Sequence, residues 1–75
     1  MTNVRNPKLL AEFGRHLAKL RKEKKMTQKD LAFSTDISIS QVSRIERGLI
    51  NPTLSTLDAL ARTLDISLVD LVDFT

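Results

Sequence analysis

Five segments of this sequence each begin with a residue that can cap an α-helix and continue with apolar side chains at helical spacing. A capping side chain accepts a hydrogen bond from a backbone N–H group that the first helical turn leaves unpaired. Apolar residues three and four positions apart then share one side of the helix, which must pack against another element. The pattern therefore predicts an all-α fold of five short helices. The candidate caps are Asn6, Thr27, Ser38, Thr53 and Ser67.

The predicted helices are separated by tight turns. They cover residues 7–24, 28–34 and 39–47, and two more begin at Leu54 and Leu68. Gly48 follows the third helix at the position where a left-handed residue commonly ends a helix. Asp36, in the turn 35–38, is one of the few non-glycine types that tolerate a left-handed backbone. Because a chain of 75 residues buries only about 60% of its unfolded surface, we expect one domain, 1–75, that is modestly stable or relies on a partner subunit.

The residue types exclude several kinds of catalytic site. The sequence has no cysteine, which removes disulfides, thiolate catalysis and cysteine-ligated metals. His16 is the single histidine, so neither a metal site nor a histidine-activated nucleophile has its partners, and we expect His16 at the surface or its boundary. We therefore expect no enzyme activity, no cofactor and no bound metal.

The sequence also carries no sign of a membrane or secretory segment. Its apolar runs are too short to span a bilayer, and residues 1–7 lack the apolar stretch of a signal peptide. A small domain without disulfides is more typical of the cytoplasm than of secreted proteins. We expect a cytoplasmic protein with no membrane partner.

Charge is divided unevenly along the chain. Residues 1–49 hold eleven Lys and Arg against five Asp and Glu, a net +6, whereas residues 50–75 have a net −3. This asymmetry suits a polyanion bound on one side, but a solvated basic surface explains it equally well. For the cluster Lys22, Lys24 and Lys25, interaction with the carbonyl end of the first helix is favoured over phosphate contact.

The segment 27–48 joins two short helices through a turn of about four residues, which is typical of a helix-turn-helix unit. Val42 and Ile45 are spaced to face the core from the second helix. The opposite face then projects Ser40, Gln41, Ser43, Arg44 and Arg47. An α-helix fits the major groove of DNA. There arginine can hydrogen-bond to guanine, glutamine to adenine and serine to several bases, and the apolar Ile39 can contact the methyl group of thymine.

The order and spacing of several short motifs resemble one known family, the Xre/Cro-type helix-turn-helix regulators. These include lambdoid phage repressors and restriction-modification controller proteins. The resemblance extends over residues 13–71. The motifs are Leu20-Arg21, Thr27-Gln28-Lys29-Asp30-Leu31-Ala32, Ile37-Ser38, Ile45-Glu46-Arg47-Gly48, Asn51-Pro52-Thr53-Leu54-Ser55-Thr56-Leu57, Leu60-Ala61 and Leu64-Asp65-Ile66-Ser67-Leu68. The resemblance implies a compact five-helix, lambda-repressor-like DNA-binding domain with the helix-turn-helix at helices two and three.

The resemblance also implies roles for individual residues. The base-reading positions match Ile39, Ser40 and Arg44, with Gln41 and Ser43 beside them. The phosphate-contacting positions match Thr27, Gln28, Arg47 and Asn51, and Gln28 would also brace the recognition helix. Arg21 and Glu46 match a structural ion pair. Two positions depart from the family pattern, since Asp36 stands where glycine is usual and Ile39 where a polar residue is frequent.

These inferences predict a sequence-specific regulator of transcription that binds double-stranded DNA as a homodimer on a pseudo-palindromic operator. The alternative is an antitoxin-like module that neutralises a partner protein and regulates its own operon. Val72 and Phe74, near the end of the chain, are candidates either for the core or for a dimer seam.

Overall fold

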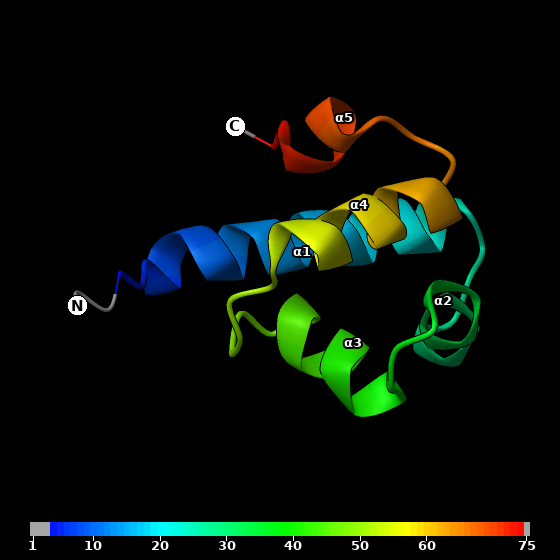
Figure 1. Ribbon diagram of the computed structural model, residues 1–75, viewed down its shortest axis with the longest axis horizontal. Helices are drawn as coiled ribbons and strands as arrows, with labels where there is room; N and C mark the ends of the chain where they lie inside the picture. The colour runs from blue at the N-terminus through cyan, green and yellow to red at the C-terminus, as the bar shows by residue number, and fades with distance from the viewer. Residues whose placement is uncertain (1–3, 75) are drawn as a thin grey trace.

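Five α-helices make up most of the part of the chain that the computed structural model describes, residues 4–74 (Figure 1). Their bounds are α1, Pro7–Glu23; α2, Gln28–Thr35; α3, Ile39–Glu46; α4, Leu54–Thr63; and α5, Leu68–Val72. The predicted all-α fold is therefore confirmed, and the predicted ends of the first three helices differ from the observed ones by a single residue each. Residues 1–3 and 75, which the predicted domain includes, lie outside the described residues.

Each predicted cap begins a helix in the structure. In all five, the side chain accepts a hydrogen bond from the backbone N–H three residues later, which pairs one of the donors at the helix start. At α2 the arrangement is reciprocal, because Asp30 also accepts from the backbone of Thr27. The five pairs are Asn6 with Leu9, Thr27 with Asp30, Ser38 with Gln41, Thr53 with Thr56 and Ser67 with Asp70.

Four helices end through the same left-handed turn. The first or second residue after the helix has a positive φ, and the next residue donates its N–H back to a carbonyl five positions earlier, as Ile37 does to Ala32 at 3.0 Å and Leu49 to Arg44 at 2.9 Å. Asp36 is left-handed as predicted, with φ 64°. The left-handed residues are Lys25, Asp36, Gly48 and Asp65. These turns reverse the chain within a few residues, so the helices pack closely.

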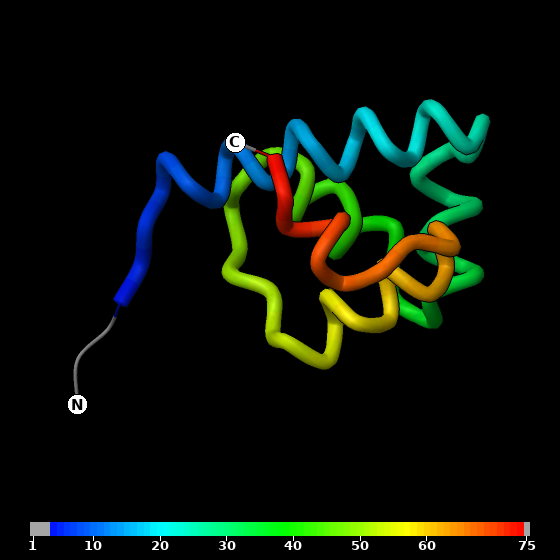
Figure 2. Tube along the Cα trace, turned by 90° about the horizontal axis from the view of Figure 1, so that it is seen from above, coloured from blue at the N-terminus to red at the C-terminus, as the bar shows by residue number. Residues whose placement is uncertain are grey.

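The helices are arranged on three levels around the core. In Figure 1, α1 and α4 lie in the middle, α2 and α3 below them and α5 above. Figure 2, seen from above, places α5 over the space between α1 and α4. Val42 and Ile45 of α3 are buried as predicted. The largest fully buried side chains are Leu17, Leu31, Ile45, Leu60, Leu64, Leu71 and Val42.

The carboxyl end of α3 contacts α1 at a glycine that the sequence analysis did not single out. A Cβ atom built on Gly14 would overlap the carbonyl oxygens of Glu46 and Ile45, the second at 2.6 Å. At the following turn, a Cβ on Gly48 would lie 2.7 Å from Ala11 Cα, and its φ of +73° is one that other residues rarely adopt. The two glycines therefore allow α3 to lie directly against α1, which fixes the direction in which its other face points.

Val72 and Phe74, which were candidates either for the core or for a dimer seam, differ in how deeply they are buried. Phe74 packs on the core, with its ring centroid 6.0 Å from that of Phe13 and 5.6 Å from that of His16. Val72 is 44% exposed. His16 is half-buried, and its Nε2 lies 3.2 Å from the carbonyl oxygen of Asp70, so it joins α1 to α5. Across residues 4–74, no helix has both the length and the apolar character needed to cross a membrane.

Candidate nucleic-acid interface

One face of α3 is open to solvent along its length. Ile39 is 48% exposed, and Ser40, Arg44 and Arg47 are also exposed, whereas Val42 and Ile45 on the opposite face are buried. Figure 1 places α3 at the lower edge of the molecule, with no other helix beneath it. The exposed side chains supply hydrogen-bond donors and acceptors together with one apolar group.

Two of the predicted base-reading side chains are less accessible than the others. Gln41 and Ser43 are half-buried, which places them at the border of the exposed face of α3. Arg44 projects freely, because the ion pairs of residues 4–74 join Arg21 to Glu46 and Arg62 to Asp58 and do not include it. Arg44 therefore retains all five N–H donors for an external acceptor.

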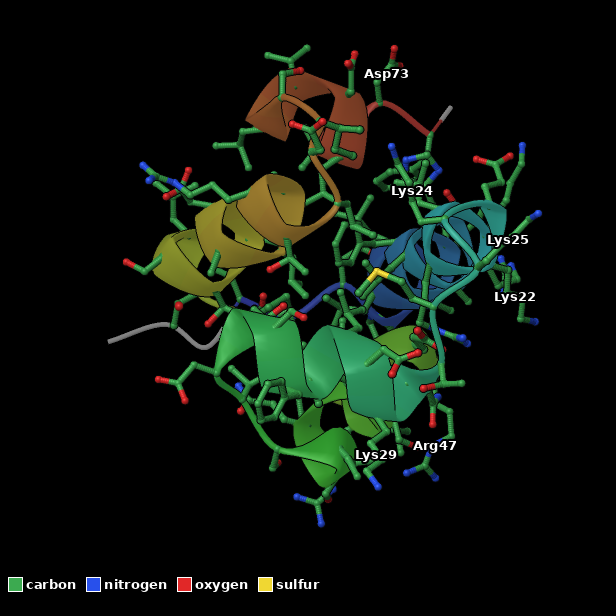
Figure 3. The ribbon with its side chains drawn as sticks, turned by 90° about the vertical axis from the view of Figure 1, so that its right-hand side faces the viewer. Lys22, Lys24, Lys25, Lys29, Arg47 and Asp73 are labelled. Atoms are coloured by element: carbon green, nitrogen blue, oxygen red, sulfur yellow. The ribbon has the colours of Figure 1, made fainter. Side chains whose placement is uncertain are left out.

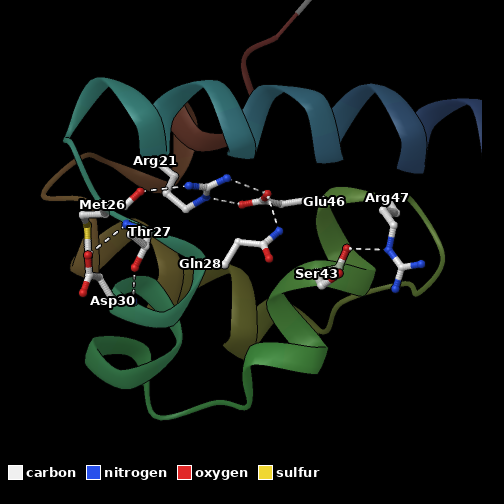
Figure 4. A network of polar contacts seen from close by, with 8 residues as sticks. All are labelled: Arg21, Met26, Thr27, Gln28, Asp30, Ser43, Glu46 and Arg47. Atoms are coloured by element: carbon white, nitrogen blue, oxygen red, sulfur yellow. Dashed lines mark hydrogen bonds and ion pairs between the residues drawn. The ribbon is translucent and has the colours of Figure 1, made fainter.

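A polar network holds α3 to the two preceding helices (Figure 4). Arg21 Nε donates to Glu46 Oε2 at 2.6 Å, and Arg21 Nη2 donates to Oε1 at 3.0 Å. Arg21 Nη1 donates to the carbonyl oxygen of Met26 at 2.8 Å, and Gln28 Nε2 donates to Glu46 Oε1 at 3.0 Å. The network therefore joins α1, the following turn, α2 and the end of α3.

The ion pair at the centre of this network is largely shielded from water. The side chains of Arg21 and Glu46 are 10% and 7% exposed. The hydrogen bond to Glu46 raises the pKa of Arg21 above its ordinary value, and desolvation of the guanidinium opposes that effect. A two-point arginine–carboxylate contact fixes orientation as well as distance, so the network sets the angle of α3 relative to α1.

The start of α2 presents the first two predicted phosphate contacts. The Thr27 N–H donates to Asp30 Oδ2 at 2.9 Å, and Thr27 Oγ1 accepts from the Asp30 N–H at 3.0 Å. The hydrogen bond from the Thr27 backbone N–H lowers the pKa of Asp30, and the Thr27 side chain acts in the same direction. The second N–H of the Gln28 amide is not used in these bonds, so it can still be donated to a phosphate.

The other two predicted phosphate contacts, Arg47 and Asn51, lie at the end of α3 and in the following loop. Arg47 Nε donates to the carbonyl oxygen of Ser43 at 3.3 Å, while the rest of its exposed guanidinium points outward (Figure 4). Asn51 is exposed in the loop before α4. Arg5 reaches this loop from the amino-terminal segment, and its Nη2 donates to the carbonyl oxygen of Leu49 at 2.8 Å. Arg5 was not predicted from the sequence, because no local pattern links residues that are 44 positions apart.

The lysines do not all lie on the side of α3. Figure 3 shows Lys29 and Arg47 on the lower side of the molecule with α3, whereas Lys22 and Lys25 project sideways from the end of α1 and Lys24 lies above them. Of the cations labelled there, those on the side of α3 are Lys29 of α2 and Arg47 at the end of α3.

An apolar groove lies on another part of the surface. It has a volume of about 320 Å³ and includes Val72 and Phe74, both predicted as a possible dimer seam. Its remaining lining comes from α1, α4 and the loop between α3 and α4: Leu9, Leu10, Phe13, Asn51, Pro52 and Leu57. Asn51 thus borders this groove and also belongs to the set of predicted phosphate contacts.

Comparison with known proteins gives consistent matches. The family model HTH_3, described as helix-turn-helix, matches residues 17–71. Control protein C.BamHI of Bacillus amyloliquefaciens is 38% identical over the whole chain, covering 89% of that protein. The HTH-type transcriptional regulator DdrOP3 of Deinococcus deserti is 42% identical over 76% of this chain, which spans only 44% of the regulator's length.

A solved structure has the same fold. The restriction-modification controller protein C.AhdI from Aeromonas hydrophila superposes with a TM-score of 0.81 and is 39% identical. The match covers 83% of this chain and 94% of that one. The likeness therefore extends over nearly the whole of the controller protein and includes the helices that carry the exposed face described above.

Proposed function

This chain belongs to the HTH_3 family of helix-turn-helix proteins, and we propose that it is a sequence-specific regulator of transcription that binds double-stranded DNA through α3. The observation that carries the proposal is the division of α3 into two faces. Val42 and Ile45 are fixed in the core, while Ser40 and Arg44 point outward from a helix that is held to α1 and α2 by the Arg21–Glu46 network. A helix presented in this way fits the major groove.

Some of the exposed residues recognise bases, and others contact phosphates and so position the protein on the DNA. Arg44 has the geometry to donate two hydrogen bonds to guanine, and Ser40 can pair with several bases. Gln41 and Ser43 act at the border of the same face. The phosphate contacts come from Thr27, Gln28, Arg47 and Asn51, which lie before and after the recognition helix in the chain. Phosphate contacts supply affinity that does not depend on sequence, whereas base contacts supply the specificity.

The same proposal includes a homodimer. Val72 and Leu9 are 44% and 46% exposed beside the apolar groove, and burial of this surface by a second copy would remove it from water. In a two-fold dimer the two recognition helices would read half-sites about 34 Å apart, one turn of the duplex. The relatives named above are regulators and controllers, which favours this function over an antitoxin-like module. The site of action is the cytoplasm, where bacterial-type regulators meet DNA.

The proposal is tested by selecting bound sequences from a random pool of double-stranded DNA. We expect one recurring half-site, repeated with two-fold symmetry, and an affinity on the order of 10⁻⁸ M or tighter at physiological salt. Arg44→Ala should cost about 1–3 kcal/mol at one base position and relax the preference there. Arg62→Ala is the matched control, because Arg62 is also an exposed cation but lies on α4. Unselective recovery of sequences by the wild-type protein, or an Arg44→Ala variant with unchanged preference, would contradict the proposal.

A further inference from the structure

Phe33 is an aromatic residue whose side chain does not pack in the core. Its side chain is 88% exposed on α2, whereas Phe13 is buried and Phe74 packs against the core. The neighbouring residues Leu31 and Ala32 supply the buried face of α2. Phe33 caps no helix and takes part in none of the ring contacts among residues 4–74. An exposed aromatic of this kind points to a contact with another molecule.

Phe33 borders a shallow apolar hollow next to the recognition helix. The hollow has a volume of about 380 Å³ and is lined on one side by Phe33 and Ala32 of α2 and on the other by Ile37 and Ile39. Ile39 is the first residue of α3 and is 48% exposed. The hollow is therefore continuous with the face of α3 that we assign to base recognition.

One cation at the edge of the hollow is available to bind an anionic group. Lys29, one helical turn before Phe33, also lines the hollow and belongs to neither ion pair of residues 4–74. In Figure 3 it lies on the lower side with α3. Asp30 borders the hollow too, but its carboxylate accepts from the Thr27 N–H at 2.9 Å and serves the helix start. A free ammonium group beside an apolar surface matches a nucleotide that carries both a phosphate and a methyl group.

We propose that Phe33 is a specificity-determining residue: together with Ile39 it receives the 5-methyl group of a thymine at the edge of the half-site, and Lys29 contacts a neighbouring phosphate. Thymine is the base that presents a methyl group in the major groove, and phenylalanine is among the side chains suited to contact it. The inference rests on the proposed function, since it needs α3 in the groove. It adds α2 to the elements that read sequence.

The test removes the methyl group alone. Replacing one thymine of the selected site by uracil at a time keeps every hydrogen bond of the base pair and deletes a single methyl group. At one position per half-site, we expect Kd of the wild-type protein to rise about fourfold, the value that corresponds to about 0.8 kcal/mol for one buried methyl-sized group. In the Phe33→Ser variant, which keeps only the Ile39 side of the contact, the ratio of uracil to thymine Kd at that position should fall clearly below the wild-type value.

Two further variants separate this contact from general effects. Phe33→Leu keeps an apolar side chain and should retain a penalty for uracil, whereas Lys29→Ala should weaken binding to all sites alike and lower the salt slope by about 1. Because Phe33 is exposed, the serine variant loses no core packing, and circular dichroism checks that it folds.

The outcomes distinguish the two proposals. If the wild-type protein selects no sequence, the proposed function fails. If Arg44→Ala weakens binding and relaxes the preference, but Phe33→Ser keeps the wild-type ratio of uracil to thymine affinity at every position, then only the role of Phe33 is overturned. In that case Phe33 faces something other than DNA, such as a protein.

Discussion

Replacement of Glu46 by alanine tests whether the buried network holds the recognition helix. The change leaves the guanidinium of Arg21, 10% exposed, without its carboxylate, and it removes three hydrogen bonds at once, two from Arg21 and one from Gln28. Breaking a buried ion pair from one side costs about 3–5 kcal/mol. A chain of 75 residues has a total stability of roughly 4–11 kcal/mol, so the loss is a large share of it.

Thermal and urea denaturation at one fixed protein concentration measure this loss. At about 4–8 °C per kcal/mol, Tm of the Glu46→Ala variant should fall by at least about 12 °C. Asp58→Ala is the matched control, because it breaks the exposed pair with Arg62 and should cost at most about 1 kcal/mol. The paired replacement Arg21→Met with Glu46→Leu removes both charges and should recover much of the stability. A loss below about 1 kcal/mol for Glu46→Ala would refute the reasoning that this pair fixes α3.

Two further predictions concern pH and salt. The pKa of Asp30 is lowered in the folded state by its hydrogen bonds with Thr27, so this carboxylate stabilises the fold above the ordinary aspartate pKa, and the contribution is lost as the pH falls through the lowered value. Urea midpoints should therefore show Asp30→Asn less stable than wild type at pH 6, with the gap narrowing in acid; a gap independent of pH would show that the charge is not involved. Arg47→Ala should lower the slope of log Kd against log salt by about 1 and leave the selected sequence unchanged, as measured by titrating the operator at several salt concentrations. An altered sequence preference would instead make Arg47 a base-reading residue.

The helix starts could be predicted because they depend on neighbouring residues. A serine, threonine or asparagine followed by apolar residues at helical spacing is a local signal for a helix start. Each predicted cap accepts a hydrogen bond from the backbone N–H three residues later. The left-handed residues were less predictable. Gly48 and Asp36 belong to types that favour this conformation, whereas Lys25 adopts it because the Met26 N–H bonds the Arg21 carbonyl at 3.1 Å.

Contacts between distant segments could not be predicted from local patterns. The close approach of α3 to α1 at Gly14 and the bond from Arg5 to the Leu49 carbonyl depend on the packed arrangement of the helices. The pairing of Arg21 with Glu46 came from family resemblance, since nothing in their spacing places them together. The orientation of Phe33 likewise required the structure, because its position in an eight-residue helix does not determine which side is covered.

The claim that the outer face of α3 binds DNA is tested most directly by NMR titration of the ¹⁵N-labelled protein with its selected operator. The account predicts the largest shifts at the backbone amides of residues 39–44, together with those at the start of α2, and small shifts in α4. Unchanged amides along α3, with the shifts gathered instead in α5, would contradict it.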